Sequence, residues 1–285
     1  MTGRVALLAL AAWLGATVCL ADLDRVRPRF TGAEGHRYLE LARRARPALL
    51  GYDALAADVV WLQAIQYIAD RTGARRDLAG LYPFLDAATE LDPRYQVVYY
   101  LGGTALVALD RRPDEALRLL EKGERALPTD WQIPFLLGYT HLFYYQDFAA
   151  AARYIERAAA NVGRPTYLTN LAARLYAEAG SPEAALAFLE RMRQQTTDPA
   201  VRAGIEERMG EVVVDRELKR IDAAVAAYRA ARHRAPQTIE ELVRTGYLVP
   251  PPVEPFGGRY RLDPQTGTAS TTSGRGRLKI YRRGG

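Results

Sequence analysis

The sequence is short of the residues that build most catalytic and metal sites. It contains one cysteine, Cys19, so it has neither an internal disulfide nor a cysteine-based zinc site. Its three histidines are scattered, and none has a second histidine or cysteine three or four positions away, the spacing of a helical metal site. A GxSxG motif, a P-loop and a glycine-rich phosphate cradle are also missing. The prediction is a non-enzymatic protein with no catalytic residue, metal or cofactor.

Lysine is scarce as well, and arginine carries almost all of the positive charge. The formal net charge is +6, but from Gly258 onward seven basic residues face a single acid, Asp263, so residues 1–257 are neutral overall. A basic tail of this kind is most often solvated, although it also suits anionic lipid or nucleic acid. Nucleic-acid binding would favour aromatics interleaved on an ordered face, and only Tyr260 and Tyr281 are near. We expect no nucleic-acid partner.

An apolar run opens the chain. Met1–Arg4 is short and basic, and Val5–Ala21 is an unbroken run of apolar or small residues. As a helix this run would be about 25 Å long, slightly less than the ~30 Å hydrocarbon core of a bilayer. It is typical of a short membrane anchor or of the apolar region of a signal peptide. A buried core helix is less favoured because the run lacks a polar stripe.

We predict a bacterial inner-membrane protein with one anchor at residues 5–21 and its body in the periplasm. The export-signal form of residues 1–21 supports this orientation, whereas the arginines of 25–29 slightly oppose it. The alternative is cleavage after Ala21, which would release a soluble periplasmic protein but would place Cys19 where alanine is preferred. Residues 22–50 are polar and rich in arginine, and are expected to form a stalk with one pre-repeat helix.

Residues 51–199 repeat a helix–turn–helix pattern at a period close to 34. The best-formed unit is 131–158, two amphipathic helices that meet at Gln146-Asp147. Three units share a leucine and a small residue in the first helix, followed by three regularly spaced apolar positions in the second. These are Leu101-Gly102 with Ala116, Leu120 and Gly123, Leu137-Gly138 with Ala151, Ile155 and Ala158, and Leu171-Ala172 with Ala185, Leu189 and Met192. A divergent first unit, built from helices beginning at Leu55 and at Asp77, makes about four repeats.

This pattern resembles the tetratricopeptide repeat (TPR) family. Prolines close the units at Pro93 and Pro128, and Pro165 and Pro199 lie within a residue or two of the same place. The resemblance implies an all-α fold, a superhelical solenoid of antiparallel helix pairs whose small residues let paired helices approach closely. The chain departs from the family at Val98 and Pro134, where an aromatic residue is usual.

The resemblance also implies a concave groove lined by the first helix of each pair. By register, eight residues are expected to line it: Gln96, Tyr99, Gln132, Phe135, Tyr139, Leu142, Thr169 and Tyr176. A tyrosine-rich, uncharged groove suits an apolar or extended peptide, because aromatic side chains give a large contact area for little loss of side-chain entropy. The competing interpretation is that several of these aromatics pack between helices.

The remaining chain is predicted to leave the repeats. Residues 200–234 are predicted to form one long or kinked helix that caps the repeats, with an apolar set that runs from Ile205 to Tyr228. In residues 235–285, Thr238 and Glu241 form a capping box for a short helix over 239–244. A β-hairpin is expected from 259–262 and 268–272.

Residues 235–285 resemble the C-terminal portion of type II secretion pseudopilins. The residues that carry the resemblance are Pro236, Thr238, Ile239, Glu240, Glu241 and Leu242, then Pro255, Phe256, Gly257, Gly258 and Tyr260. The cleavable methylation motif of that family is absent. The resemblance therefore implies a folding module or docking surface rather than pilin assembly.

Together these features predict a protein-binding scaffold or adaptor at the inner membrane. Its partner would be a protein or peptide held in the groove, within a secretion or pilus-like envelope assembly. The alternative is a structural carrier or assembly factor for an envelope enzyme or exported polypeptide, with no specific peptide groove.

Overall fold

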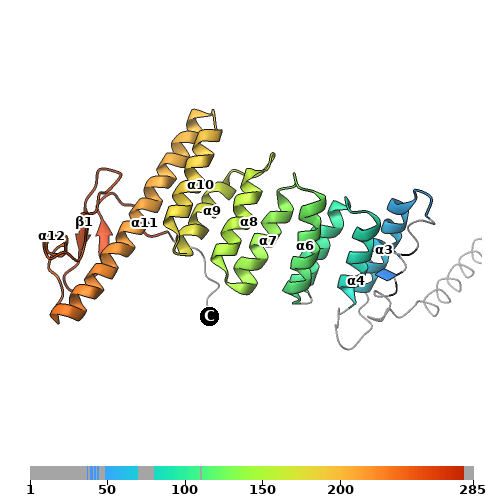
Figure 1. Ribbon diagram of the computed structural model, residues 1–285, viewed down its shortest axis with the longest axis horizontal. Coiled ribbons are helices and arrows are strands. Elements are labelled where there is room, and N and C mark those ends of the chain that lie inside the picture. Colours follow the sequence, from blue (N-terminus) through green and yellow to red (C-terminus); the bar gives the residue numbers. More distant parts are fainter. Residues whose placement is uncertain are drawn as a thin grey trace, which may run out of the picture. The chain divides into compact units, whose positions relative to one another are not determined.

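Helices make up nearly all of the regular structure in the computed structural model (Figure 1). The structure describes residues 49–69, 80–109 and 111–278, with single positions between 37 and 44. The predicted anchor, most of the stalk and residues 279–285 lie outside this range. The chain divides into two compact units, Met1–Asp92 and Pro93–Gly285, and each is described by itself.

In the first unit, α3 (Asp53–Ala69) packs against α4 (Leu81–Leu91). The rings of Tyr67 and Phe84 lie 5.6 Å apart, and the Tyr67 hydroxyl accepts a hydrogen bond of 3.2 Å from the backbone N–H of Gly80. The buried face of α3 consists of Ala57, Val60, Trp61, Ala64 and Tyr67. Ile65 is 41% exposed, and Tyr67 supplies the ring that contacts Phe84 of α4.

The second unit begins with helices in which each packs on the next along the chain. They are η2 (Val98–Gly102), α5 (Gly103–Ala108), α6 (Pro113–Ala126), α7 (Gln132–Thr140), η3 (His141–Tyr145), α8 (Phe148–Ala160), α9 (Tyr167–Glu178) and α10 (Pro182–Gln195). The two η segments are single turns of π-helix. The predicted junction between α7 and α8 is confirmed: Gln146 has a left-handed backbone, and the Asp147 carboxylate caps α8 by accepting from the Ala150 N–H at 2.9 Å.

Small residues set the distance between paired helices, as predicted. A Cβ added at Gly138 would lie 2.8 Å from Ile155 Cδ1, so only glycine allows this contact without movement. In the preceding pair Gly103 makes the close approach, since its added Cβ would lie 2.9 Å from Leu120. Gly103 and Leu120 each lie 35 residues before Gly138 and Ile155. The predicted Gly102 is also buried, whereas Leu101 is 57% exposed.

The helix α11 (Pro199–Arg232) is continuous and does more than cap the repeats. Its first half packs on α9 and α10, where Ile205 and Val212 join the core of the helix pairs. Its second half builds a separate core with α12 and the hairpin, centred on Leu218, Ile221 and Tyr228. The first half of α11 covers the α9–α10 pair, and its apolar residues continue along the helix into the second core.

The C-terminal elements agree closely with prediction. They are α12 (Ile239–Arg244) and the antiparallel strands β1 (Tyr260–Leu262) and β2 (Ala269–Thr271), with Arg261 opposite Ser270. Gly246, which follows α12, has a φ of +78°, as expected for a glycine that ends a helix. The predicted hairpin is thus confirmed to within one residue at each strand end.

The basic segment after the hairpin is not simply solvated. Arg275 pairs with Glu207 and Glu211 of α11, and its guanidinium lies 5.0 Å from the centre of the Phe256 ring. Arg277 pairs with Asp222 at 2.6 Å. The expectation of a free tail is therefore wrong for residues 275–277, because the acids of α11 face them.

The fold is mainly α-helical, in agreement with the predicted all-α class. Within the described ranges, none of the helices combines the length and apolar character that a membrane span requires.

Candidate functional site

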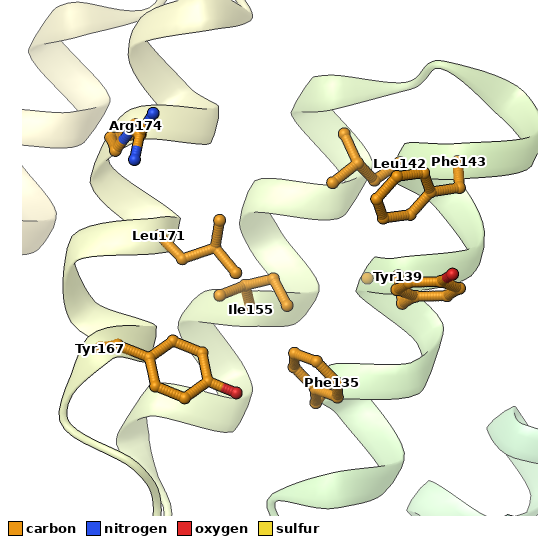
Figure 2. Close-up of a pocket in the computed structure, with 9 residues that line it drawn as sticks. Phe135, Tyr139, Leu142, Phe143, Ile155, Tyr167, Leu171 and Arg174 are labelled. Carbon is orange, nitrogen blue, oxygen red and sulfur yellow. The ribbon is translucent and has the colours of Figure 1, made fainter. Parts of the chain in front are cut away.

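An apolar groove of about 340 Å³ lies among α7, η3, α8 and α9 (Figure 2). We call it the aromatic groove. Residues from all four elements line it: Phe135, Gly138, Tyr139, Leu142, Phe143, Ile155, Tyr167, Leu171 and Arg174. Figure 2 shows α7 and η3 along one side and α9 along the other, with Ile155 of α8 between them.

The first side of the aromatic groove follows from the sequence of α7. Phe135, Tyr139 and Leu142 recur at intervals of four and three, so they share one face of the helix. The Tyr139 and Phe143 rings lie 4.4 Å apart at 40°, which adds an aromatic pair to that side. Tyr139 remains 42% exposed. This side therefore presents aromatic surface that no other part of the unit covers fully.

The second side consists of Tyr167, Leu171 and Arg174, which share one face of α9. Tyr167 is 53% exposed. Glycine at 138 lets α7 and α8 approach until Ile155 forms the floor. The aromatic groove is thus fixed by backbone packing, and its rim is made of exposed rings.

The structure brings together three of the eight predicted groove residues, Phe135, Tyr139 and Leu142. The repeat register predicts that Thr169 and Tyr176 also lie on this surface, because they occupy positions on α9 equivalent to the predicted groove positions on α7. Neither lines the groove. Thr169 and Tyr176 each lie two residues, or about 200° around the helix, from Tyr167 or Arg174, so they face away from the groove.

The other five predicted residues have structural roles. Tyr99 is fully buried, contacts Gly123 closely, and donates a hydrogen bond of 3.0 Å to the Pro93 carbonyl. Gln96 donates to Asp130. The backbone N–H of Gln132 also donates to Asp130, at 2.7 Å.

On α9, Thr169 is buried. The Tyr176 hydroxyl donates to Glu156, and burial together with this carboxylate raises the pKa of Tyr176. Tyr99 and Tyr176 therefore have packing roles within the helix pairs, and Thr169 is buried. Phe143, Tyr167, Leu171 and Arg174 were missed. The i, i+4, i+7 spacing of 167, 171 and 174 is the signal that marks them as one face.

The neighbouring aromatics of η3 turn away from the groove. The Tyr144 hydroxyl donates to the Val107 carbonyl at 3.3 Å, and the Tyr145 hydroxyl donates to Asp114. Burial and the Asp114 carboxylate raise the pKa of Tyr145 to about 12. His141 stacks on Tyr154 with 5.2 Å between ring centres, and burial lowers its pKa. These side chains tie η3 to its neighbours.

Among the described residues, the lining of the aromatic groove contains one charged side chain, Arg174, and two tyrosines, and its other residues are apolar. Over the described part of the chain, no group of three or more histidine, cysteine, aspartate or glutamate side chains is placed to hold a metal ion.

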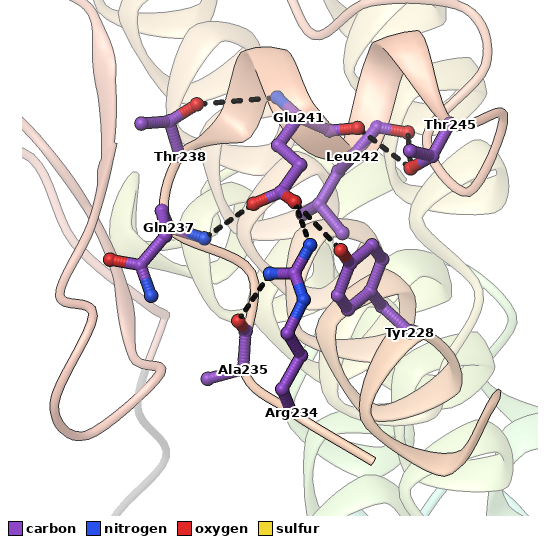
Figure 3. A network of polar contacts seen from close by, with 8 residues as sticks. All are labelled: Tyr228, Arg234, Ala235, Gln237, Thr238, Glu241, Leu242 and Thr245. Carbon is purple, nitrogen blue, oxygen red and sulfur yellow. Dashed lines mark hydrogen bonds and ion pairs between the residues drawn. The ribbon is translucent and has the colours of Figure 1, made fainter. Parts of the chain in front are cut away.

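A polar network organises the C-terminal module around Glu241 (Figure 3). Its carboxylate accepts hydrogen bonds from Arg234 at 2.5 Å, from the Gln237 N–H at 2.7 Å and from the Tyr228 hydroxyl at 2.7 Å. The Glu241 N–H donates to Thr238 Oγ1 at 3.2 Å, which confirms one half of the predicted capping box. The return bond to the Glu241 carboxylate comes from the Gln237 N–H, one residue before the N-cap. Arg234, followed by the other two donors, lowers the pKa of Glu241 to about 2. The network is structural and holds α12 against α11.

Comparison with protein-family models, with curated proteins and with solved structures found no match. The candidate function therefore rests on the residues and geometry described above.

Proposed function

We propose that the chain is a non-enzymatic, TPR-like scaffold that holds a polypeptide segment in the aromatic groove. The observation that carries the proposal is the groove itself, which is open and apolar and has half-exposed aromatic side chains on both sides. Aromatic residues of this kind dominate the binding energy of protein interfaces. The helix pairs joined by close glycine contacts, at the period of the sequence repeat, support the TPR-like solenoid.

The setting of this scaffold is part of the same proposal. The apolar run at 5–21 supports a tether to the bacterial inner membrane, with the body in the periplasm. The α12 and hairpin module supports a place in a secretion or pilus-like envelope assembly, because its elements match those expected from the pseudopilin resemblance.

Photocrosslinking in the producing cells tests the groove directly. A photoreactive phenylalanine analogue replaces Tyr139 or Tyr167 in the full-length protein, and the matched control carries it at Tyr52, an exposed tyrosine of the first unit. We expect a discrete adduct from both groove positions and none of that size from Tyr52. Tyr139→Ala in the protein labelled at Tyr167 should reduce the adduct about tenfold, the effect of losing an aromatic anchor. An adduct from all three positions, or from none, contradicts the proposal.

A further inference from the structure

Among the residues that the structure describes, Arg174 is the one charged side chain that lines the aromatic groove. Its Nε atom is buried and has no hydrogen-bond partner among the residues that the structure describes. A buried N–H without an acceptor costs free energy, and a guanidinium cannot lose its proton to avoid that cost. A ligand that brings a carboxylate to the accessible nitrogens of the Arg174 guanidinium forms a charge-assisted hydrogen bond that an apolar ligand lacks.

The acceptor best suited to a guanidinium is a carboxylate, because the planar fork binds two oxygens at once. No acid lines the groove, so a carboxylate on the ligand meets no repulsion from the lining. The charge of the site is thus complementary to an anion, while the rest of the lining is complementary to apolar side chains.

The positions on α9 fix how far apart these two features lie. Tyr167 and Leu171 make the apolar part and Arg174 the charged end, as Figure 2 shows. The midpoint between Tyr167 and Leu171 lies five residues before Arg174, which is about 7 Å along the helix axis. An extended peptide covers about 3.3 Å per residue and returns to the same side every second residue. The spacing therefore matches an apolar residue and an acidic residue two positions apart.

We propose that the aromatic groove binds an extended polypeptide in which an apolar side chain is followed two positions later by aspartate or glutamate, with the carboxylate held by Arg174. This inference rests on the proposed function and names the chemistry of its ligand. A polypeptide is favoured over a fatty acid because the groove is open and its rim carries the Tyr139 and Tyr167 rings, with hydroxyls suited to a peptide backbone.

Two blocked peptides that differ in one charge test the inference. They are acetyl-Ala-(4-fluoro-Phe)-Ala-Asp-Ala-amide and its Asn counterpart, and binding to the full-length protein in lipid nanodiscs is followed by fluorine NMR. We expect the Asp peptide to bind about ten times more tightly, the usual gain from a hydrogen bond to a charged group. The preference should vanish in Arg174→Gln, persist in part in Arg174→Lys, and remain in Arg153→Gln, an exposed arginine outside the groove.

The outcomes separate this inference from the function on which it rests. Equal binding of both peptides, abolished by Tyr139→Ala, overturns the role of Arg174 but leaves a peptide-binding groove. A preference for Asp that survives Arg174→Gln also overturns it. If neither peptide binds, or if sodium laurate binds in their place, both the inference and the proposed peptide groove are wrong. Thermal unfolding of each variant checks that Arg174→Gln remains folded.

Discussion

Gly138 is a single residue on which the aromatic groove depends. A methyl group at this position would meet Ile155 Cδ1 at 2.8 Å and the Ala151 carbonyl oxygen at 3.2 Å. We expect Gly138→Ala to reduce the free energy of unfolding by about 1–3 kcal/mol, the usual cost of overpacking a core. The control is Gly204→Ala, a helical glycine with nothing within 4 Å of its added Cβ. That change should stabilise the protein by about 0.5–1 kcal/mol.

Urea unfolding followed by circular dichroism measures both glycine variants. If the two substitutions had the same sign, the close contact between α7 and α8 would not exist in solution. Both positions are helical, and alanine lowers the backbone entropy of the unfolded chain by the same amount at each. The two variants therefore differ in the contact that the added methyl group makes.

Glu241 gives the C-terminal module a predictable response to acid. Its pKa in the folded chain is about 2, below the ordinary value of 4.5, because Arg234, the Gln237 N–H and Tyr228 all donate to its carboxylate. A depressed pKa contributes stability that is complete above about pH 4.5 and is lost as the pH falls towards 2. Glu241→Gln should remove this contribution and flatten the pH dependence.

Amide hydrogen exchange in α12 from pH 5 to pH 3 measures the effect of Glu241, after correction for intrinsic exchange rates. The matched control is Glu240→Gln, because Glu240 is the adjacent glutamate and is exposed. The wild type and this control should lose protection over the same pH range. An acid response that is unchanged in Glu241→Gln would contradict the assignment.

At the scale of elements, the second half of α11 depends on the module that follows it. Removal of residues 235–285 would uncover Leu218, Ile221 and Tyr228, which pack against α12 and the hairpin. It would also remove Arg275 from Glu207 and Glu211. We therefore expect a chain that ends at Arg234 to lose amide protection over about 214–232 while α8–α10 keep theirs. Hydrogen exchange with mass spectrometry measures this. Full protection of the shortened α11 would show that the helix stands alone.

The sequence predicts elements better than it predicts the faces that neighbouring elements share. The capping box at Thr238 and the hairpin strands follow from local patterns, so they were predicted to within a residue. Gly103 was missed because Gly102 and Gly103 are adjacent, and the interval of 35 residues that relates Leu120 to Ile155 relates Gly103, rather than Gly102, to Gly138. Thr169 and Tyr176 were misplaced because repeat register gives the direction of a side chain but does not say which neighbour it faces.

At the scale of the second unit, α11 connects two hydrophobic cores that share no buried residue. One core contains Leu189 on α10 and the other contains Leu242 on α12, and both side chains are fully buried. A Leu→Ala change at a buried site costs about 2–5 kcal/mol. Because the two cores have no buried residue in common, each substitution should lower protection mainly in its own core.

Hydrogen exchange of Leu189→Ala and Leu242→Ala, compared residue by residue, distinguishes coupled from independent cores. We expect Leu242→Ala to accelerate exchange in α12 and in 214–232 of α11, and to leave α8 and α9 close to wild type. Leu189→Ala should do the reverse. Equal loss throughout both cores would mean that α11 and its ion pairs to Arg275 join them into one cooperative unit. In that case a ligand in the aromatic groove would also stabilise the hairpin module, because ligand binding stabilises every part of a unit that unfolds together.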